Sequence, residues 1–154
     1  PCCLVGSEMC IRDRFKDFIK SSGVKKGDFG IEVTETAELN NLSLASLRLS
    51  SIKNLGVSIA LDDFGAGYSA LRYLKDLPID LLKLDKSFTN EMAETHNQSL
   101  IQIAKLMADS LSMEFICEGL EEEWQIEKAI SLGCERGQGY FLHKPCSLED
   151  LTNE

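Results

Sequence analysis

Two adjacent carboxylates at the end of an apolar run are the residues of this chain best suited to chemistry. Asp62 and Asp63 follow the apolar run 57–61 and precede the glycine-rich turn 64–67. A buried carboxylate either raises its pKa or pairs with a positive group, and two adjacent carboxylates also repel each other. A divalent metal ion relieves both costs, so this segment predicts a metal site.

More polar side chains recur where the other apolar runs end. These residues are Glu32, Glu35, Lys83, Asp85, Glu118, Glu121 and Gln138. In a parallel α/β barrel the carboxyl ends of the strands converge on one face, where active sites are built. An open doubly wound sheet would bring only one or two of these positions together, at its switch point. The pattern therefore favours a barrel with one shared polar site.

The residue types in this set predict the metal. Four carboxylates (Glu32, Asp62, Asp63 and Glu118), with Lys83 and Gln138, offer hard oxygen ligands and no soft ligand. Such donors suit Mg²⁺ or Mn²⁺ rather than zinc or copper. Two such ions about 4 Å apart are a common device for phosphodiester hydrolysis, because they stabilise the attacking and leaving oxygens together. Lys83 would then neutralise phosphate charge or orient the attacking water.

Alternating strand-like and helix-like segments must position these side chains. We expect strands at 29–34, 57–61, 81–84, 114–117 and 137–141, each short and apolar. Apolar helix faces are expected at Leu42, Ala45, Leu49 and Ile52 (ended by Gly56), at Leu100, Ile103, Ala104, Met107 and Leu111, and at Trp124, Ala129 and Ile130 (ended by Gly133). Phe15, Phe18 and Ile19 indicate the tail of a helix whose beginning is missing. This alternation is typical of an α/β protein with a parallel sheet.

Composition excludes several function classes. The 154 residues suffice for one domain, and the net charge of −9 argues against a nucleic-acid polymer as partner, because no Lys/Arg patch is present. No apolar run approaches the ~20 residues that span a bilayer, so no membrane contact is expected from this segment. Of the six cysteines, Cys2, Cys3 and Cys10 belong to the N-terminal segment interpreted below as non-native. The other three, Cys117, Cys134 and Cys146, are widely spaced and predict neither a zinc site nor a disulfide framework. A reducing cytoplasm fits best.

The N-terminal segment is interpreted separately. Residues 3–14 resemble the peptide obtained when a sequencing adapter is translated by mistake, and they make a poor signal peptide. We therefore interpret residues 1–14 as non-native and residues 15–154 as the domain.

From Phe15 to the C-terminus the chain resembles the EAL family, the cyclic-di-GMP phosphodiesterases of bacterial signalling. The motifs that carry the resemblance occur in the family's order. They are 31–36 (IEVTET), 61–71 (LDDFGAGYSAL), 77–85 (LPIDLLKLD), 117–121 (CEGLE) and 138–141 (QGYF) followed by Lys144-Pro145. Ala66 stands where the family more often has Thr.

The resemblance implies a TIM-type barrel, a role for each site residue and a substrate, cyclic-di-GMP, which the family hydrolyses to linear 5′-phosphoguanylyl-guanosine. By resemblance, Glu32 and Asp62 ligate a first metal ion, Asp62 and Asp63 reach a second, and Glu118 serves the second as ligand or general base. Lys83 and Asp85 flank the water and phosphate, and Gln138 contacts the phosphate or water. Glu35 supports the loop after Asp63, and Glu121 is assigned to the same support.

One departure from the family pattern matters. The Glu-Ala-Leu motif of the family's first strand and the Asn of its second strand, both metal ligands by resemblance, do not occur here. A full barrel needs eight strands and ~250 residues, so we expect an incomplete barrel that lacks the first two strands, exposes two sheet edges and is inactive alone. The alternatives are a non-catalytic cyclic-di-GMP receptor and another Mg²⁺-dependent barrel enzyme. Oligomeric state stays open, with a homodimer of the full domain as the candidate.

Overall fold

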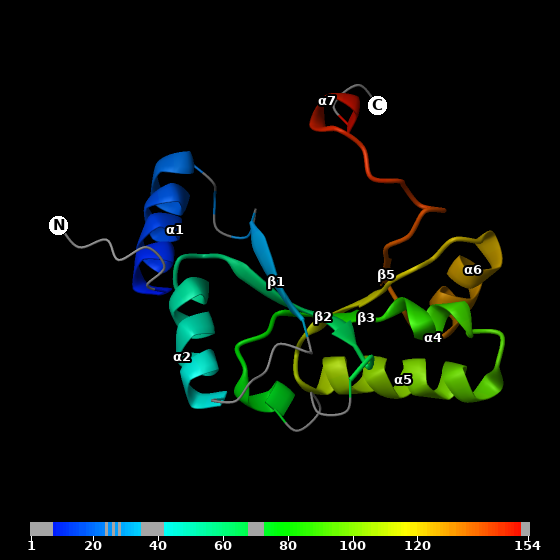
Figure 1. Ribbon diagram of the computed structural model, residues 1–154. Helices are drawn as coiled ribbons and strands as arrows, with labels where there is room; N and C mark the ends of the chain where they lie inside the picture. Colours follow the sequence, from blue (N-terminus) through cyan, green and yellow to red (C-terminus); the bar gives the residue numbers. More distant parts are fainter. Residues whose placement is uncertain are drawn as a thin grey trace.

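A five-stranded parallel sheet forms the centre of the molecule (Figure 1). The computed structural model describes residues 8–23, 25, 27, 29–34, 42–67 and 73–151. The strands are β1 (Gly30–Thr34), β2 (Ser58–Phe64), β3 (Leu81–Leu84), β4 (Glu114–Cys117) and β5 (Arg136–Gly137). Each strand pairs with the next one along the chain. A barrel has this sequential order, whereas a doubly wound sheet reverses its order at the switch point.

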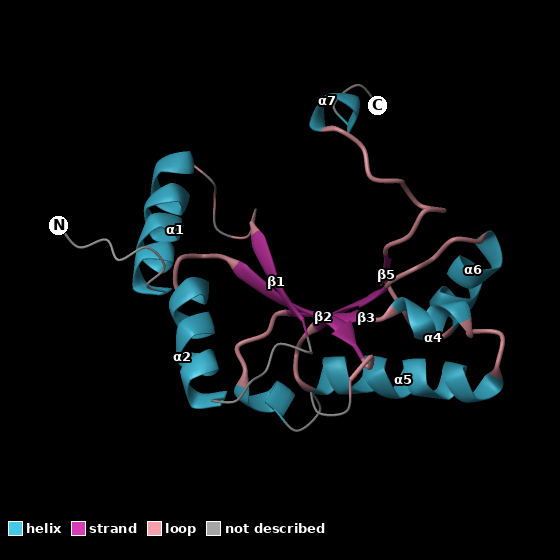
Figure 2. Ribbon diagram, viewed as in Figure 1, coloured by secondary structure: helices cyan, strands magenta, loops and turns pink. Residues whose placement is uncertain are grey.

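Helices follow the strands as the alternation predicted (Figure 2). They are α1 (Glu8–Ser22), α2 (Leu42–Lys53), the 3₁₀ turn η1 (Leu74–Asp76), α4 (Lys86–Asn90), α5 (Thr95–Ser110), α6 (Glu123–Ser131) and α7 (Leu148–Leu151). Helix α1 contains the predicted helix tail but begins at Glu8, inside the segment interpreted as non-native. Beyond β5 the chain runs away from the sheet towards α7 (Figure 1). Among the described helices, none is both long enough and apolar enough to cross a membrane.

Two strand predictions need correction. Strand β2 continues past the predicted end at residue 61 and includes Asp62, Asp63 and Phe64. The predicted last strand, 137–141, is wrong, because β5 ends at Gly137. The chain turns at Gly139, whose carbonyl oxygen accepts hydrogen bonds from the backbone N–H groups of Leu142 and His143. The other three strands lie within one residue of their predicted bounds.

The predicted buried faces of α5 and α6 are partly wrong. Leu100 and Ile103 of α5 are 38% and 61% exposed, and the buried face carries Asn97, Ile101, Ala104 and Ala108. The small side chains of Ala104 and Ala108 let α5 pack closely where it contacts β3 and β4. Trp124 and Ile130 of α6 are also exposed, whereas Gln125 and Ala129 are buried. Ala104 and Ala129 are buried as predicted, and Met107 and Leu111 pack against the core. The prediction failed where small or hydrogen-bonded residues occupy the closest contacts.

The apolar core lies on one face of the sheet. Its strand residues are Ile59 and Leu61 of β2, Leu82 and Leu84 of β3, and Phe115 and Cys117 of β4. Helices α2 and α5 contact the sheet and lie on the same side of it (Figure 1). Side chains alternate between the two faces of a strand, so the residues between these positions, Ala60, Asp62, Lys83 and Ile116, lie on the opposite face. That opposite face carries the polar site.

Candidate active site

The strand register brings charged residues from neighbouring strands onto one face. Thr34 pairs with Asp62, and Lys83 pairs with Ile116. Because paired residues and every second residue share a face, Glu32 of β1, Asp62 of β2 and Lys83 of β3 face the same side. Glu118 follows the last residue of β4, and its backbone N–H donates to the Leu84 carbonyl at 3.2 Å. The four residues therefore meet at the carboxyl ends of adjacent strands, as the sequence predicted.

Lys83 is the centre of this group. Its side chain is only 5% exposed, and its Nζ lies 2.8 Å from Glu32 Oε1, 2.8 Å from Asp62 Oδ1 and 2.7 Å from Glu118 Oε1. Burial by itself lowers the pKa of Lys83, but the hydrogen bonds to the three carboxylates outweigh burial and raise that pKa well above its ordinary value. The lysine is therefore a permanent positive charge at neutral pH, and it uses its three donors on three carboxylates.

Glu118 has the opposite balance. Burial raises the pKa of its carboxyl group above the ordinary value of 4.5, and the neighbouring Asp62 and Glu32 carboxylates raise it further. Lys83 opposes this shift but does not cancel it. A carboxylate with a raised pKa is a better proton acceptor than an exposed glutamate. This environment suits either a metal ligand or a general base.

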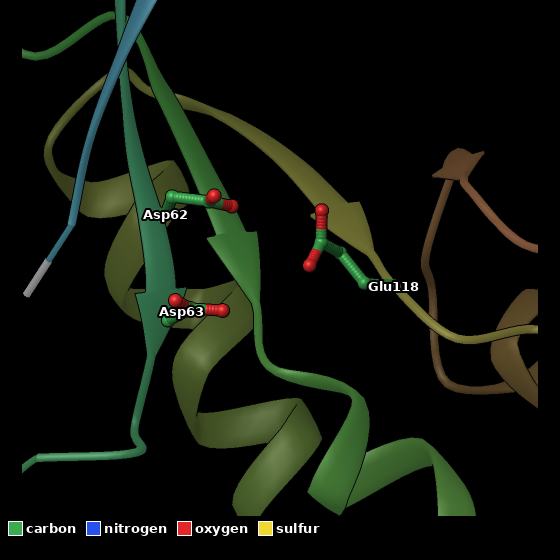
Figure 3. A group of neighbouring side chains, drawn as sticks. All are labelled: Asp62, Asp63 and Glu118. Atoms are coloured by element: carbon green, nitrogen blue, oxygen red, sulfur yellow. The ribbon is translucent and has the colours of Figure 1, made fainter.

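Asp63 reaches the same site through an unusual backbone conformation. Alternation along β2 would turn its side chain to the helix-covered face, opposite to Asp62. However, Asp63 has φ +55°, and the register of β2 against β3 shifts between Leu61 and Phe64, as at a β-bulge. Figure 3 shows the Asp62 and Asp63 carboxylates directed towards Glu118. One carboxylate oxygen from each of the three residues lies within 4.8 Å of the corresponding oxygens of the other two.

This donor set fits a hard divalent cation. Asp62, Asp63 and Glu118 supply carboxylate oxygens from two strand ends at a mutual spacing that one ion can bridge. Lys83 balances only one of the four carboxylate charges in this group, so the remaining negative charge favours a cation. Glu32 joins the group through Lys83, and its side chain is 55% exposed. Mg²⁺ or Mn²⁺ is compatible with every donor in the set.

The remaining predicted residues lie in different positions. Asp85 caps α4, because its carboxylate accepts a hydrogen bond from the Ser87 N–H at 3.0 Å. Gln138 and Glu121 are exposed, and the Gln138 N–H donates to the Cys117 carbonyl at 2.9 Å. The structure does not bring these three side chains into the group around Lys83, and their roles stay predictions. Glu35 and the motif residues 68–71 lie outside the described residues.

Several residues that support the site were missed by sequence reasoning. Thr89 and Gln125 are buried, and their hydrogen bonds hold the segment after β4. A Gln three residues after Glu122, at a helix start, was a readable signal of a capping box. Cys117 is buried as predicted, but its contact with Cys134 was not foreseen, with the two Sγ atoms 3.2 Å apart. That contact and burial raise the pKa of the Cys117 thiol, which therefore stays protonated.

Known proteins with similar sequences and structures share one domain type. The family model for the EAL domain matches residues 2–145, beginning inside the segment interpreted as non-native, and that interpretation stays a prediction. The cyclic di-GMP phosphodiesterase PdeA of Borreliella burgdorferi is 35% identical over 131 residues, which are 84% of this chain and 20% of PdeA. This chain spans about a fifth of the length of the curated relatives it matches.

Solved structures agree with the sequence comparison. The EAL domain of Mycobacterium smegmatis DcpA is similar with a TM-score of 0.89 and 30% identity, over 97% of this chain and 67% of that one. PaMucR phosphodiesterase, solved as a c-di-GMP complex, gives a TM-score of 0.86 and 31% identity, over 94% of this chain and 59% of that one. These likenesses confirm the fold class expected from the sequence, part of a TIM-type barrel.

Proposed function

Because this chain belongs to the EAL domain family, we propose that it forms the metal-binding part of a phosphodiesterase that hydrolyses cyclic-di-GMP to linear 5′-phosphoguanylyl-guanosine. The observation that carries this proposal is the group around Lys83. Its ammonium contacts carboxylates from β1, β2 and the end of β4, and Asp63 adds a fourth carboxylate beside two of them. The substrate proposal draws on relatives named as cyclic di-GMP phosphodiesterases and on the PaMucR complex.

The proposed cofactor is a pair of Mg²⁺ or Mn²⁺ ions. Asp62, Asp63 and Glu118 would hold an ion through their clustered oxygens, and Glu32 would contribute with Asp62 to the other. Divalent ions bound there would stabilise the negative charge that develops on the phosphodiester. With a net charge of −9, the chain needs such ions to attract an anionic dinucleotide.

The protein's own groups have separable tasks in this proposal. Lys83 stays protonated and holds Glu32, Asp62 and Glu118 at one point, which limits the reorganisation needed when ligands bind. When a phosphate enters, the same ammonium can exchange one of these carboxylate contacts for a phosphate oxygen. Glu118, whose pKa burial raises, can accept a proton from the attacking water. Asp85 caps α4 through one carboxylate oxygen, and its place beside the water and phosphate remains part of the proposal.

Turnover by the 154-residue chain alone is not expected. By the resemblance, the family's Glu-Ala-Leu motif and second-strand Asn supply two further ligands, and neither occurs in this sequence. We therefore propose that the chain binds Mn²⁺ but leaves cyclic-di-GMP intact. Purified chain incubated with Mn²⁺ and cyclic-di-GMP, followed by chromatography for the linear product, tests this. Product formed by the chain and lost in Asp62→Asn would show that the residues present suffice.

The absent motif also favours a second candidate function, a receptor that binds cyclic-di-GMP without cleaving it. Sequencing the source gene upstream of the codon for Phe15 and assaying the protein that the whole gene encodes separates the two candidates. Finding the Glu and Asn ligands, together with metal-dependent turnover, supports the phosphodiesterase. Finding both replaced, with cyclic-di-GMP bound and recovered intact, supports the receptor. We also propose a cytoplasmic location and a homodimer of the full domain. Cell fractionation and the molar mass in solution of the protein encoded by the whole gene test these two proposals.

A further inference from the structure

The short helix α4 packs against both loops that carry the proposed metal ligands. On one side, a Cβ added at Gly65 would lie 2.5 Å from the Phe88 ring. On the other side, a Cβ added at Gly119 would lie 2.5 Å from the Lys86 Cβ and 3.1 Å from the Thr89 hydroxyl. Gly65 follows Asp63 by two residues, and Gly119 follows Glu118 directly. Helix α4 therefore lies between the Asp63 loop and the Glu118 loop, in contact with a glycine of each.

Thr89 links α4 to Glu118 through a buried hydrogen bond. Its residue exposure is 0%, and its Oγ1 donates to the Glu118 carbonyl oxygen at 2.6 Å. The Lys86 carbonyl lies 2.9 Å from the same hydroxyl, as a weaker second acceptor for its one hydrogen. A buried hydroxyl costs free energy unless it is hydrogen-bonded, and valine would fill the same space without that cost. The bond to Glu118 is thus what the hydroxyl adds at this position.

Gln125 extends this link to the rest of the segment after β4. Its Nε2 donates to the Thr89 carbonyl at 3.2 Å, and its Oε1 accepts from the N–H groups of Glu121 and Glu122 at 2.7 and 2.9 Å. Gln125 is itself buried. The amide therefore joins α4, the segment that begins at Glu118 and the first turn of α6. Glu118 is fixed at its carbonyl by Thr89, and the segment that follows is fixed by Gln125.

We infer that Thr89 is a positioning residue for divalent-ion binding, which fixes the Glu118 backbone and so the distance from the Glu118 carboxylate to Asp62 and Asp63. This inference rests on the proposed metal site. In characterised metal sites, mutating a residue that hydrogen-bonds to a metal ligand typically lowers metal affinity about 10–100-fold. The Thr89 hydroxyl contacts the Glu118 and Lys86 carbonyls and none of the proposed ligand carboxylates, so the inference has it act through the Glu118 backbone.

The experiment compares Mn²⁺ binding by the 154-residue chain and two variants, measured by isothermal titration calorimetry. Thr89→Val keeps the volume and removes the hydroxyl, whereas Thr89→Ser keeps the hydroxyl. Urea unfolding without metal is measured for all three proteins. We expect Thr89→Val to weaken Mn²⁺ affinity about tenfold and Thr89→Ser to stay close to the original chain. Thr89→Ala, which removes the hydroxyl without placing a second methyl group at the site, should lose Mn²⁺ affinity as Thr89→Val does.

The alternative outcomes are distinct. Thr89→Val that unfolds at lower urea yet binds Mn²⁺ as tightly as the original chain would show a merely structural hydroxyl and overturn the inference. Equal losses in Thr89→Val and Thr89→Ser would also overturn it, because the hydroxyl would then not be the cause. If the original chain binds no Mn²⁺, the proposed metal site itself fails and the positioning role fails with it. Should Thr89→Val not fold, Mn²⁺ affinity lost in Thr89→Ala and kept in Thr89→Ser supports the inference, and affinity retained in Thr89→Ala opposes it.

Discussion

Asp62 and Asp63 are consecutive residues of β2, yet their carboxylates lie on the same side of the strand. The left-handed backbone at Asp63, with φ +55°, and the register shift before Phe64 produce this arrangement. Asp and Asn adopt this conformation more readily than other residues with a side chain, and β-branched residues adopt it least. The type of residue at position 63 therefore matters for the backbone as well as for charge.

Variants at Asp63 should separate these two requirements. We expect Asp63→Asn to unfold at nearly the same urea concentration as the original chain but to bind Mn²⁺ more weakly. Asp63→Val should in addition lose about 1–3 kcal/mol of stability, because a β-branched residue is strained at positive φ. Urea unfolding and Mn²⁺ titration of both variants provide the measurement. Equal stability of the two variants would contradict the backbone requirement.

Removing Lys83 should destabilise the fold even though the lysine is polar. Lys83→Met leaves three carboxylates crowded around an uncharged side chain, and breaking a buried ion pair from one side costs about 3–5 kcal/mol. Partial exposure of Glu32 makes the lower end of that range the expectation. Divalent cations should restore part of the lost stability to Lys83→Met, since they supply the missing positive charge. Thermal unfolding with and without Mn²⁺ measures both effects.

Above neutral pH, the stabilising effect of Lys83 should only decrease. Its pKa is raised in the folded chain, so its contribution is fully present below the ordinary value of about 10.5 and is lost as the pH rises through the folded value. The difference in unfolding free energy between the original chain and Lys83→Met should therefore be constant around neutral pH and shrink above pH 10.5. A difference that widens at high pH would refute the assignment.

Glu118→Gln tests the raised pKa of Glu118. A raised carboxyl pKa means that the folded chain binds the proton more tightly than the unfolded chain, so the original chain loses stability as the pH rises from below 4.5 through the folded pKa. The uncharged Gln has no such loss. Measured in EDTA, the stability of Glu118→Gln relative to the original chain should increase from acid to neutral pH. In a separate titration without EDTA, Glu118→Gln should bind Mn²⁺ more weakly than the original chain. A relative stability that decreases over this range would contradict the prediction.

Two neighbouring glycines offer a matched pair for packing. A Cβ at Gly139 would lie 2.0 Å from the Leu120 carbonyl oxygen, which is backbone, whereas a Cβ at Gly137 would lie 2.4 Å from the movable Cδ1 of the Leu120 side chain. Overpacking against fixed atoms typically costs about 1–3 kcal/mol. We expect Gly139→Ala to be destabilised within this range and Gly137→Ala to be close to the original chain. Urea unfolding of the two variants measures the difference, and a larger loss in Gly137→Ala would reverse the conclusion.

The sequence predicted the parallel sheet and the charged group because both depend on local patterns. Asp62 and Glu118 each follow a short apolar run directly, which places them near the carboxyl end of a strand whatever the register between strands. Asp63 shows the limit, since nothing in the pattern of β2 distinguishes a bulge from continued alternation. On α5, Ala104 is buried as predicted, but Leu100 and Ile103 were predicted in place of Ile101 and Ala108 because the pattern gave no sign that close approach to the sheet favours a small residue. The link from Glu118 through Thr89 to Gln125 was missed because its two hydrogen bonds join residues 29 and 36 positions apart, although the local capping box of Gln125 was readable.

The sequential strand order has a consequence for when the site exists during folding. Glu32, Asp62, Lys83 and Glu118 come from four successive strand ends, and each strand pair is joined by its own crossover. Every such pairing must overcome loop-closure entropy before its contacts form, which makes parallel sheets slow to assemble. The charged group is complete only after three crossovers have closed. Ion binding is therefore a late event in the chain's folding. The rate at which Mn²⁺ binding appears after refolding starts would report the rate at which the slowest of these strands pairs.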